Sequence, residues 1–155
     1  MEVQTLEATL AAHPFFQKFQ PQHIQLIAGC ASNRRFDAGH YIFREGEAAS
    51  HFYLIRSGKV VLETFAARRG AVMIETIEAG EVLGWSWLFP PYRWHFDARV
   101  VVPTRAIVIE GTCLRSKSET DHDLGYELLT GFASILIERL QAVRLQLLDV
   151  YRDHA

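Results

Sequence analysis

The sequence predicts an α+β fold, in which an antiparallel β-roll is flanked by N-terminal helices and by one long C-terminal helix. Three observations predict it: helical spacing of apolar residues at the start, short glycine-punctuated strands in the middle, and a heptad stripe at the end. The chain has 155 residues, of which 49% are hydrophobic and 22% charged. This composition is typical of one globular domain, which we expect to span residues 1–155.

Residues 1–35 are predicted to form two or three short helices. Their apolar residues recur at mixed spacings of three and four, and two prolines interrupt the pattern. The apolar positions are Leu6, Leu10, Phe15, Phe16, Phe19, Ile24, Leu26 and Ile27, and the prolines are Pro14 and Pro21.

Residues 36–113 are predicted to form the β-roll. Strand-like segments such as "HFYLIRSGKVVLETFA" and "DARVVVPTRAIVIEG" follow one another with closely spaced glycines between them. No helix-length segment separates these strands, so parallel crossovers are excluded and an antiparallel sandwich or barrel is favoured. "ARRG", residues 67–70, is interpreted as a hairpin tip with both arginines in solvent.

Residues 120–152 are predicted to form one long helix, which the polar segment "SETDHD" introduces with capping residues. Apolar side chains alternate by three and four along it, as in a coiled coil. They are Ala133, Leu136, Leu140, Val143, Leu147 and Val150. A second apolar edge gives the helix one face for its own β-roll and one for a second copy, so we expect a homodimer; the alternative is a helix that only folds back on the roll.

Metal and catalytic sites are not expected. The seven histidines form no HxH or HExxH pair, and no nucleophile elbow, phosphate-binding loop or paired carboxylates can be placed. Cys30 and Cys113 have no partner spacing and are interpreted as buried, reduced thiols. We therefore expect a protein that is not an enzyme and has no cofactor.

Charge and hydropathy exclude two classes of partner. The net charge of −2 provides no positive field for nucleic acid or anionic lipid, and no apolar run is long enough to cross a bilayer. Only "YRDHA" follows Val150, which is too short for a helix-turn-helix module. We expect a cytoplasmic protein that binds neither DNA nor membranes directly and acts through a protein partner or a small ligand.

The order of glycines and apolar residues in "FDAGHYIFREGEAASHFYLIRSGKVVLETFA", residues 36–66, resembles the cyclic nucleotide-binding domain, the sensor module of the catabolite activator (Crp-Fnr) family. "AGEVLGWSWLF" then stands in the place of that family's phosphate-binding cassette. The resemblance covers nearly the whole chain. It implies a double-stranded antiparallel β-helix, similar to a jelly roll, with a regulatory role and a C-terminal dimer helix.

In the family, a cassette glutamate contacts the ribose, and the arginine of "R-[ST]-A" contacts the cyclic phosphate. Here Gly84 and Ala98 match the frame of the cassette, but Trp85 replaces the glutamate and Phe96 replaces the arginine. Asp97, which takes the serine or threonine place, adds a negative charge that repels a phosphate. We therefore do not expect cyclic AMP to bind in the usual mode.

Three interpretations of the cassette stay open. Its aromatic side chains, among them Trp94, either wall a pocket for a flat or apolar ligand or fill the space as core residues, and the second is the commoner role of large aromatics. In the third interpretation, Arg93 or Arg99 supplies a shifted cation for a cyclic nucleotide. The candidate ligand-binding residues are Gly84, Trp85, Ser86, Trp87, Arg93, Phe96, Asp97 and Ala98.

Overall fold

The structure, a computed structural model, describes residues 5–68 and 70–153. Arg69, one of the two arginines of the predicted hairpin tip, lies outside the described residues, as do residues 1–4, 154 and 155. The N-terminal layer consists of α1 (Leu6–Ala12), η1 (Pro14–Phe16) and α2 (Pro21–Ala28). Both prolines are first residues of these helices, where a missing N–H removes no helical hydrogen bond.

The six described strands form one antiparallel sheet that curls into the β-roll. They are β1 (Ala31–Phe36), β2 (Tyr41–Phe43), β3 (His51–Ala66), β4 (Gly70–Glu78), β5 (Val82–Leu83) and β6 (Asp97–Glu110). The order along the sheet is β1-β6-β3-β4, while β2 pairs with β6 and β5 pairs with β3. β3 and β4 form the hairpin predicted around residues 67–70, closed by the Ala66–Gly70 pair. The predicted α+β fold is thus confirmed.

Two boundaries differ from the sequence prediction. The sheet begins at Ala31, inside the range 1–35 that was assigned to helices. A helix that was not predicted, α3 (Gly111–Thr120), follows β6 and precedes α4 (His122–Asp153). The Asp121 side chain accepts a hydrogen bond from the Leu124 N–H at 3.1 Å, so a residue of the predicted capping segment caps α4.

The apolar interior is divided into two clusters. The first lies inside the roll and includes Phe43, Leu62, Trp94 and Val100. The second lies where the N-terminal helices, α3 and the first half of α4 meet the roll, and it includes Phe16, Phe52, Trp87 and Phe132. The chain between β5 and β6 contributes Trp94 to the first cluster and Trp87 to the second. It therefore connects the inside of the roll to the helical layer.

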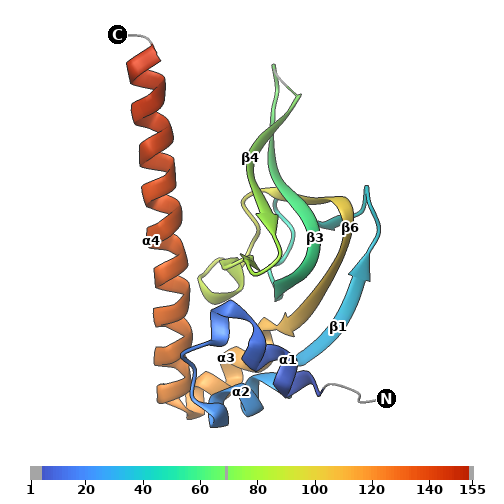
Figure 1. The fold of residues 1–155 in the computed structure, drawn as a ribbon, viewed down its shortest axis with the longest axis vertical. Helices are drawn as coiled ribbons and strands as arrows, with labels where there is room; N and C mark the ends of the chain where they lie inside the picture. Colours follow the sequence, from blue (N-terminus) through green and yellow to red (C-terminus); the bar gives the residue numbers. More distant parts are fainter. Residues whose placement is uncertain (1–4, 69, 154–155) are drawn as a thin grey trace.

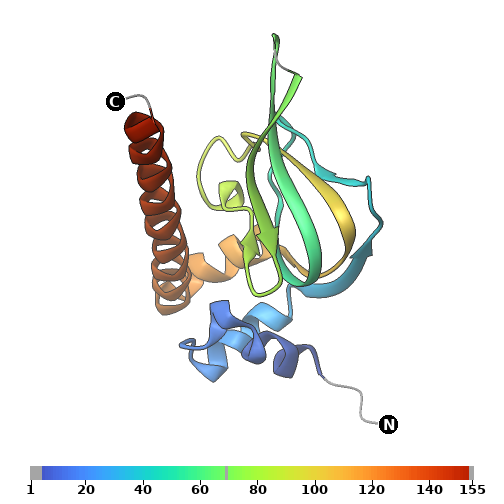
Figure 2. The same cartoon turned by 45° about the horizontal axis from the view of Figure 1, so that its top comes forward.

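Figure 1 shows α4 as a long helix beside the roll, with its C-terminal half and the β3–β4 hairpin projecting in the same direction and the N-terminal helices at the opposite end. The second view confirms that the projecting half of α4 stands apart from the roll (Figure 2). None of the helices among the described residues is both long enough and apolar enough to span a membrane.

The prediction of reduced thiols is wrong, because Cys30 and Cys113 form a disulfide with a Cα–Cα distance of 5.8 Å. The disulfide joins the end of the N-terminal layer to α3. The cysteines are separated by 83 residues in sequence, so no spacing rule relates them. They meet because β1 and β6 pair along their length, from Ala31–Ile109 to Phe36–Thr104, which brings the residues just outside both strands together.

Removal of this cross-link is expected to lower the free energy of unfolding by about 2–4 kcal/mol, because a long closed loop restricts the unfolded chain. Reduction with dithiothreitol and the Cys30→Ser/Cys113→Ser variant should lower the melting temperature by similar amounts. The variant itself should not respond to dithiothreitol. Equal melting temperatures of the oxidised and reduced wild-type protein would contradict the prediction.

Candidate functional site

Residues 82–98, which we call the cassette segment, lead from β5 through the short helix η2 (Ser86–Leu88) into β6. β5 fixes the start of the segment, since Val82 and Leu83 pair with Leu54 and Tyr53 of β3. The chain then turns at Gly84, whose φ of 94° is strained for any residue with a side chain. The segment therefore leaves the sheet at a place that only glycine adopts easily.

The indole ring of Trp94 lies against this glycine, inside the roll. A Cβ atom added to Gly84 would lie 2.6 Å from Cη2 of Trp94, which is closer than two carbon atoms can approach. The ring also stacks on Phe43, with the ring centroids 3.7 Å apart and the planes 8° from parallel. Trp94 is 3% exposed. The space beside Gly84 thus holds a buried aromatic side chain.

Trp87 points into the second cluster, between the roll and α4. Its ring stacks on Phe52 at 4.9 Å between centroids and meets the edge of Phe132 of α4 at 5.6 Å. The side chain is fully buried, and its indole N–H has no hydrogen-bond partner among the described residues. Arg115 of α3 donates a hydrogen bond to the Trp87 carbonyl oxygen. The middle of the cassette segment is therefore packed against both C-terminal helices.

Trp85 is in contact with α4 through Arg139. The guanidinium carbon of Arg139 lies 4.5 Å from the centre of the Trp85 ring, and its Nη2 donates to the Val82 carbonyl oxygen at 2.9 Å. Its Nε lies 3.4 Å from a carboxylate oxygen of Glu75 in β4. Burial lowers the pKa of Arg139, and Glu75 opposes this shift. One side chain of α4 thus contacts the cassette segment and the sheet edge together.

The two arginines considered as substitute cations are both engaged elsewhere. Arg99 makes two hydrogen bonds to the carboxylate of Glu63, at 2.8 and 3.3 Å. This bonding raises the pKa of Arg99, although partial burial opposes the shift. Arg93 is exposed and donates to the Gly46 carbonyl oxygen at 2.8 Å. Neither guanidinium is left without a partner.

The remaining predicted site residues occupy different surroundings. Asp97 accepts a hydrogen bond from the Glu45 N–H at 2.7 Å and lies 3.4 Å from Nε of Arg44. Its carboxylate therefore stabilises the turn that follows β2. Phe96 is half-buried, with its ring 6.1 Å from that of Trp85. Ala98 is buried in the roll, and Ser86 is buried in η2.

A small cavity of about 180 Å³ lies beside Trp94, in the wall formed by β2 and β3. Polar groups of Glu47, Ser50 and His51 line it, and Ser50 Oγ lies 2.8 Å from Nδ1 of His51. Tyr53 also lines it, and burial raises the pKa of its hydroxyl to about 12. Sites for drug-sized ligands usually enclose about 300–1,000 Å³. The space left beside the packed rings is smaller than that.

Comparison with known proteins identifies the family. The family model of the cyclic nucleotide-binding domain matches residues 33–121, more than half of the chain. The chain belongs to the cyclic nucleotide-binding domain family. A search of curated proteins gave no match.

Solved structures of cyclic nucleotide-binding proteins and of regulator sensor domains share the fold. A putative cyclic nucleotide-binding protein from Geobacter metallireducens GS-15 is 27% identical, with 90% of this chain and 99% of that chain covered and a TM-score of 0.79. The sensor domain of the transcriptional regulator DNR from Pseudomonas aeruginosa is 21% identical, with coverages of 85% and 89% and a TM-score of 0.68. The N-terminal domain of a transcriptional regulator from Streptomyces coelicolor A3(2) is 19% identical, with coverages of 86% and 94% and a TM-score of 0.68.

Within this cyclic nucleotide-binding domain, the structure brings together Trp85 and Phe96 of the predicted set, with Gly84 next to Trp85 in the chain. It buries Ser86 in η2 and Trp87 in the second cluster, and it places Arg93 and Asp97 at the turn around Gly46. Sequence reasoning did not single out Trp94 or Arg139. Trp94 was noted only as one of several aromatics, because spacing alone does not reveal which way its side chain or that of Arg139 points.

Among residues 5–68 and 70–153, no group of three or more histidine, cysteine, aspartate or glutamate residues is arranged to hold a metal ion. The side chains in and around the cassette segment are mainly aromatic or already paired. Such an arrangement supports packing against α4 better than it supports acid–base or metal chemistry.

The contact between Gly84 and Trp94 can be tested with a matched pair of glycine variants. Gly84→Ala is expected to lower the free energy of unfolding by about 2–4 kcal/mol, because it combines backbone strain with a steric clash. Gly39→Ala has a similar φ of 89° but meets no atom within 4 Å, so we expect only the strain, about 1–2 kcal/mol. Urea denaturation measures both, and equal losses would contradict the described packing.

Proposed function

We propose that this protein is a regulatory domain without enzymatic activity, which does not hold a cyclic nucleotide in the usual mode of its family and acts through protein contacts. Its family membership supports a regulatory role. The packing of Trp94 beside Gly84 is the observation that carries the rest, because the resemblance assigns this glycine to the phosphate-binding cassette of the family.

A cyclic phosphate entering a partly buried site needs a cation and several hydrogen-bond donors. Phe96 and Trp85 offer neither at the two positions that matter in the family. Arg99 would have to leave Glu63, and this carboxylate, which is buried, would then lose its partner at considerable cost. A shifted site for the nucleotide is therefore disfavoured on energetic grounds.

Isothermal titration calorimetry with cyclic AMP and cyclic GMP tests this proposal. We expect no saturable heat and no rise in melting temperature at millimolar nucleotide, because the two candidate cations, Arg93 and Arg99, are already bonded to the Gly46 carbonyl oxygen and to Glu63. A dissociation constant in the low micromolar range, equivalent to about −8 kcal/mol, would overturn it. In that case Arg93→Gln and Arg99→Gln would show which arginine binds the phosphate.

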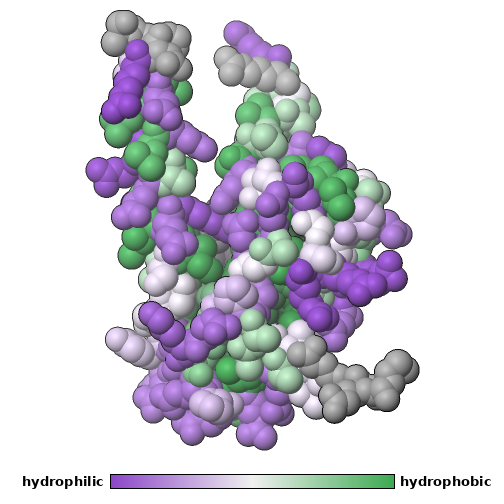
Figure 3. Space-filling model, in the orientation of Figure 1, coloured by the Kyte–Doolittle hydropathy of each residue, from purple (hydrophilic) through white to green (hydrophobic). Residues whose placement is uncertain are grey.

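We also propose that the protein is a homodimer joined through α4. The predicted heptad stripe faces solvent over most of its length: Leu140, Val143, Leu147 and Val150 are each more than half exposed. Apolar side chains also gather on the β3–β4 hairpin, where Phe65, Met73 and Ile74 are exposed. Figure 3 shows both groups on the two projecting elements. Burial of these surfaces against a second copy would remove a large apolar area from water.

Leu140→Asp and Leu147→Asp, separately or together, are expected to convert a dimer into a monomer, because each places a charge in the proposed helix pair. Leu145→Asp is the control. Leu145 is 63% exposed, similar to Leu140 at 60%, but it lies off the stripe on the opposite side of α4. Light scattering coupled to size-exclusion chromatography measures the mass, and a monomeric wild-type protein would contradict the proposal.

A second candidate function is a sensor for a ligand other than a cyclic nucleotide. The cavity beside Trp94 supports this candidate, because polar groups of Glu47, Ser50 and His51 line it and could bind a small ligand. A ligand larger than a few atoms would need Trp94 to move. The stacking of Trp94 on Phe43 and its close contact with Gly84 therefore favour a domain that acts as a platform for partners.

A further inference from the structure

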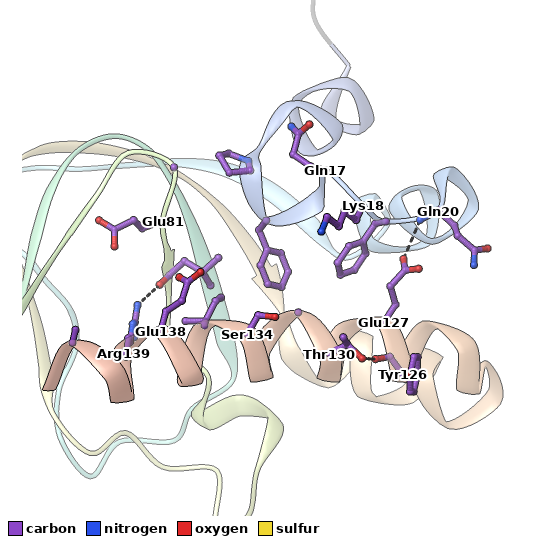
Figure 4. Close-up of a pocket in the computed structure, with 18 of the residues that line it drawn as sticks. Gln17, Lys18, Gln20, Glu81, Tyr126, Glu127, Thr130, Ser134, Glu138 and Arg139 are labelled. Carbon is purple, nitrogen blue, oxygen red and sulfur yellow. Dashed lines mark hydrogen bonds between the residues drawn. The ribbon is translucent and has the colours of Figure 1, made fainter. Parts of the chain in front are cut away.

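A long groove lies between α4 and the N-terminal layer, outside the roll and away from the cassette interior. Its volume is about 1020 Å³. α4 forms one wall, from Asp123 to Ala142, and the other wall consists of residues 14–20 and the turn before β5. Figure 4 shows Lys18 on one side and Ser134 and Thr130 of α4 on the other, while Gln17 points away from α4.

The shape of the groove indicates a long occupant. From Asp123 to Ala142 the α4 wall rises by about 1.5 Å per residue, which gives a length of about 28 Å. A compact metabolite would fill only part of this length. A helix of about 19 residues matches it.

The walls also favour a helix over an extended strand. Most of the lining belongs to α4, η1 and the turn that follows η1, and the backbone groups of a helix bond within the helix itself. A strand would need unpaired backbone donors and acceptors along its edge, whereas a helix satisfies its own backbone and needs only side-chain contacts.

The groove carries an excess of negative charge. Five carboxylate residues but only two cationic residues line it. Arg139 is already in contact with Glu75 and the Val82 carbonyl oxygen, and the Glu127 carboxylate accepts hydrogen bonds from the Gln20 N–H and the His23 ring. Glu81, Glu138 and Asp123 make no salt bridge within the described residues.

Glu75 and Glu81 lie at the acidic end of the groove. Burial raises the pKa of Glu75, the salt bridge with Arg139 opposes this shift, and the negative charge of Glu81 adds a smaller rise. Glu81 accepts a hydrogen bond from the Glu78 N–H but forms no salt bridge within the described residues. The occupant that fits this end therefore carries positive charge.

Apolar side chains complete the lining. Phe15, Phe19, Val82 and Ile135 contribute to it. The rings of Phe15 and Phe19 pack 5.5 Å apart. The groove thus combines an apolar strip with carboxylates, which is the pattern that complements an amphipathic helix with basic residues.

The groove does not use the proposed dimer stripe. Ser134 and Glu138, which line it, are each two residues away from Leu136 and Leu140 of the stripe. Two residues turn an α-helix by about 200°, so the groove and the stripe lie on nearly opposite sides of α4. A second copy on the stripe would leave the groove accessible.

We propose that this groove binds a basic amphipathic helix of a partner protein. Lysine or arginine side chains of that helix pair with Glu81 and Glu138, and its apolar face rests on Phe15 and Phe19. This proposal rests on the proposed function in one respect, namely that the protein acts through a protein partner. The absence of nucleotide binding and the homodimer are tested separately, by calorimetry and by the mass measurements.

The test uses the full-length protein and a fluorescein-labelled 19-residue peptide with lysine and leucine placed to make one basic and one apolar helix face. We expect saturable binding in fluorescence anisotropy at 50 mM salt, and weaker binding as the salt concentration rises. Glu81→Gln/Glu138→Gln should weaken it at least ten-fold. Ser134→Trp, which fills the groove from an exposed position, should abolish binding while the oligomeric state stays unchanged.

The control variant is Glu45→Gln/Glu119→Gln, which removes the same net charge from exposed positions outside the groove. It should bind the peptide as the wild-type protein does. Equal weakening in both double variants would overturn the proposal in favour of general charge attraction. Displacement of the peptide by an equal concentration of spermine would overturn the proposal in favour of a small cation. Binding of a glutamate–leucine peptide as tight as that of the lysine–leucine peptide would also overturn it.

Discussion

The packing of the Trp94 indole inside the β-roll is the contact on which the arrangement of the cassette segment depends. The ring stacks on Phe43, and the absence of a side chain at Gly84 allows the ring to approach the backbone closely. The backbone of Trp94 is bonded as well, because its N–H donates to the Glu47 carbonyl and its own carbonyl accepts from the Gly46 N–H. With these contacts in place, the interior of the roll needs no charged ligand to be filled.

The pairing of Arg99 with Glu63 also keeps a charge out of the aromatic interior of the roll. A guanidinium pointing into an interior lined with rings would lose its water without gaining an anion. On the strand pair of β3 and β6 it instead meets a carboxylate in a two-bonded geometry. The cations of this region therefore stabilise the strands and the turns, while the aromatic rings occupy the interior.

α4 has three sides with different surroundings. One side is buried against the roll through Leu128 and Phe132, a second lines the acidic groove, and a third carries the exposed heptad stripe. Arg139 lies between the buried side and the groove and contacts Trp85. A displacement of α4 along any of these sides would change the surroundings of the cassette segment, because Trp87 and Trp85 both touch this helix.

Sequence reasoning could predict the elements whose patterns are long and regular. The segment "HFYLIRSGKVVLETFA" is β3 residue for residue, and the C-terminal heptads correctly indicated one long helix. α3 was missed because its ten residues contain few apolar side chains and no clear period. The start of β1 was missed because four of its six residues are exposed, so it lacks the alternation of a half-buried strand.

For the candidate site, the sequence predicts that Trp85 and Phe96 stand in place of the ribose-binding glutamate and the phosphate-binding arginine, because this prediction requires only the identity of residues in a matched frame. It could not show which ring fills the interior. Trp85, Trp87 and Trp94 have similar sequence surroundings, yet they point toward Arg139, Phe52 and Phe43 respectively. The direction of each side chain depends on the turn at Gly84 and on contacts with residues more than thirty positions away.

The disulfide between Cys30 and Cys113 gives the domain a covalent topology with a mechanical consequence. All six described strands lie between the two cysteines, so the whole sheet belongs to one closed ring of chain. The N-terminal helices and the α4 rod leave this ring from the two sides of the same cross-link. A pull on α4 can therefore reach the N-terminal helices through one covalent junction, without being transmitted through the hydrogen bonds of the sheet.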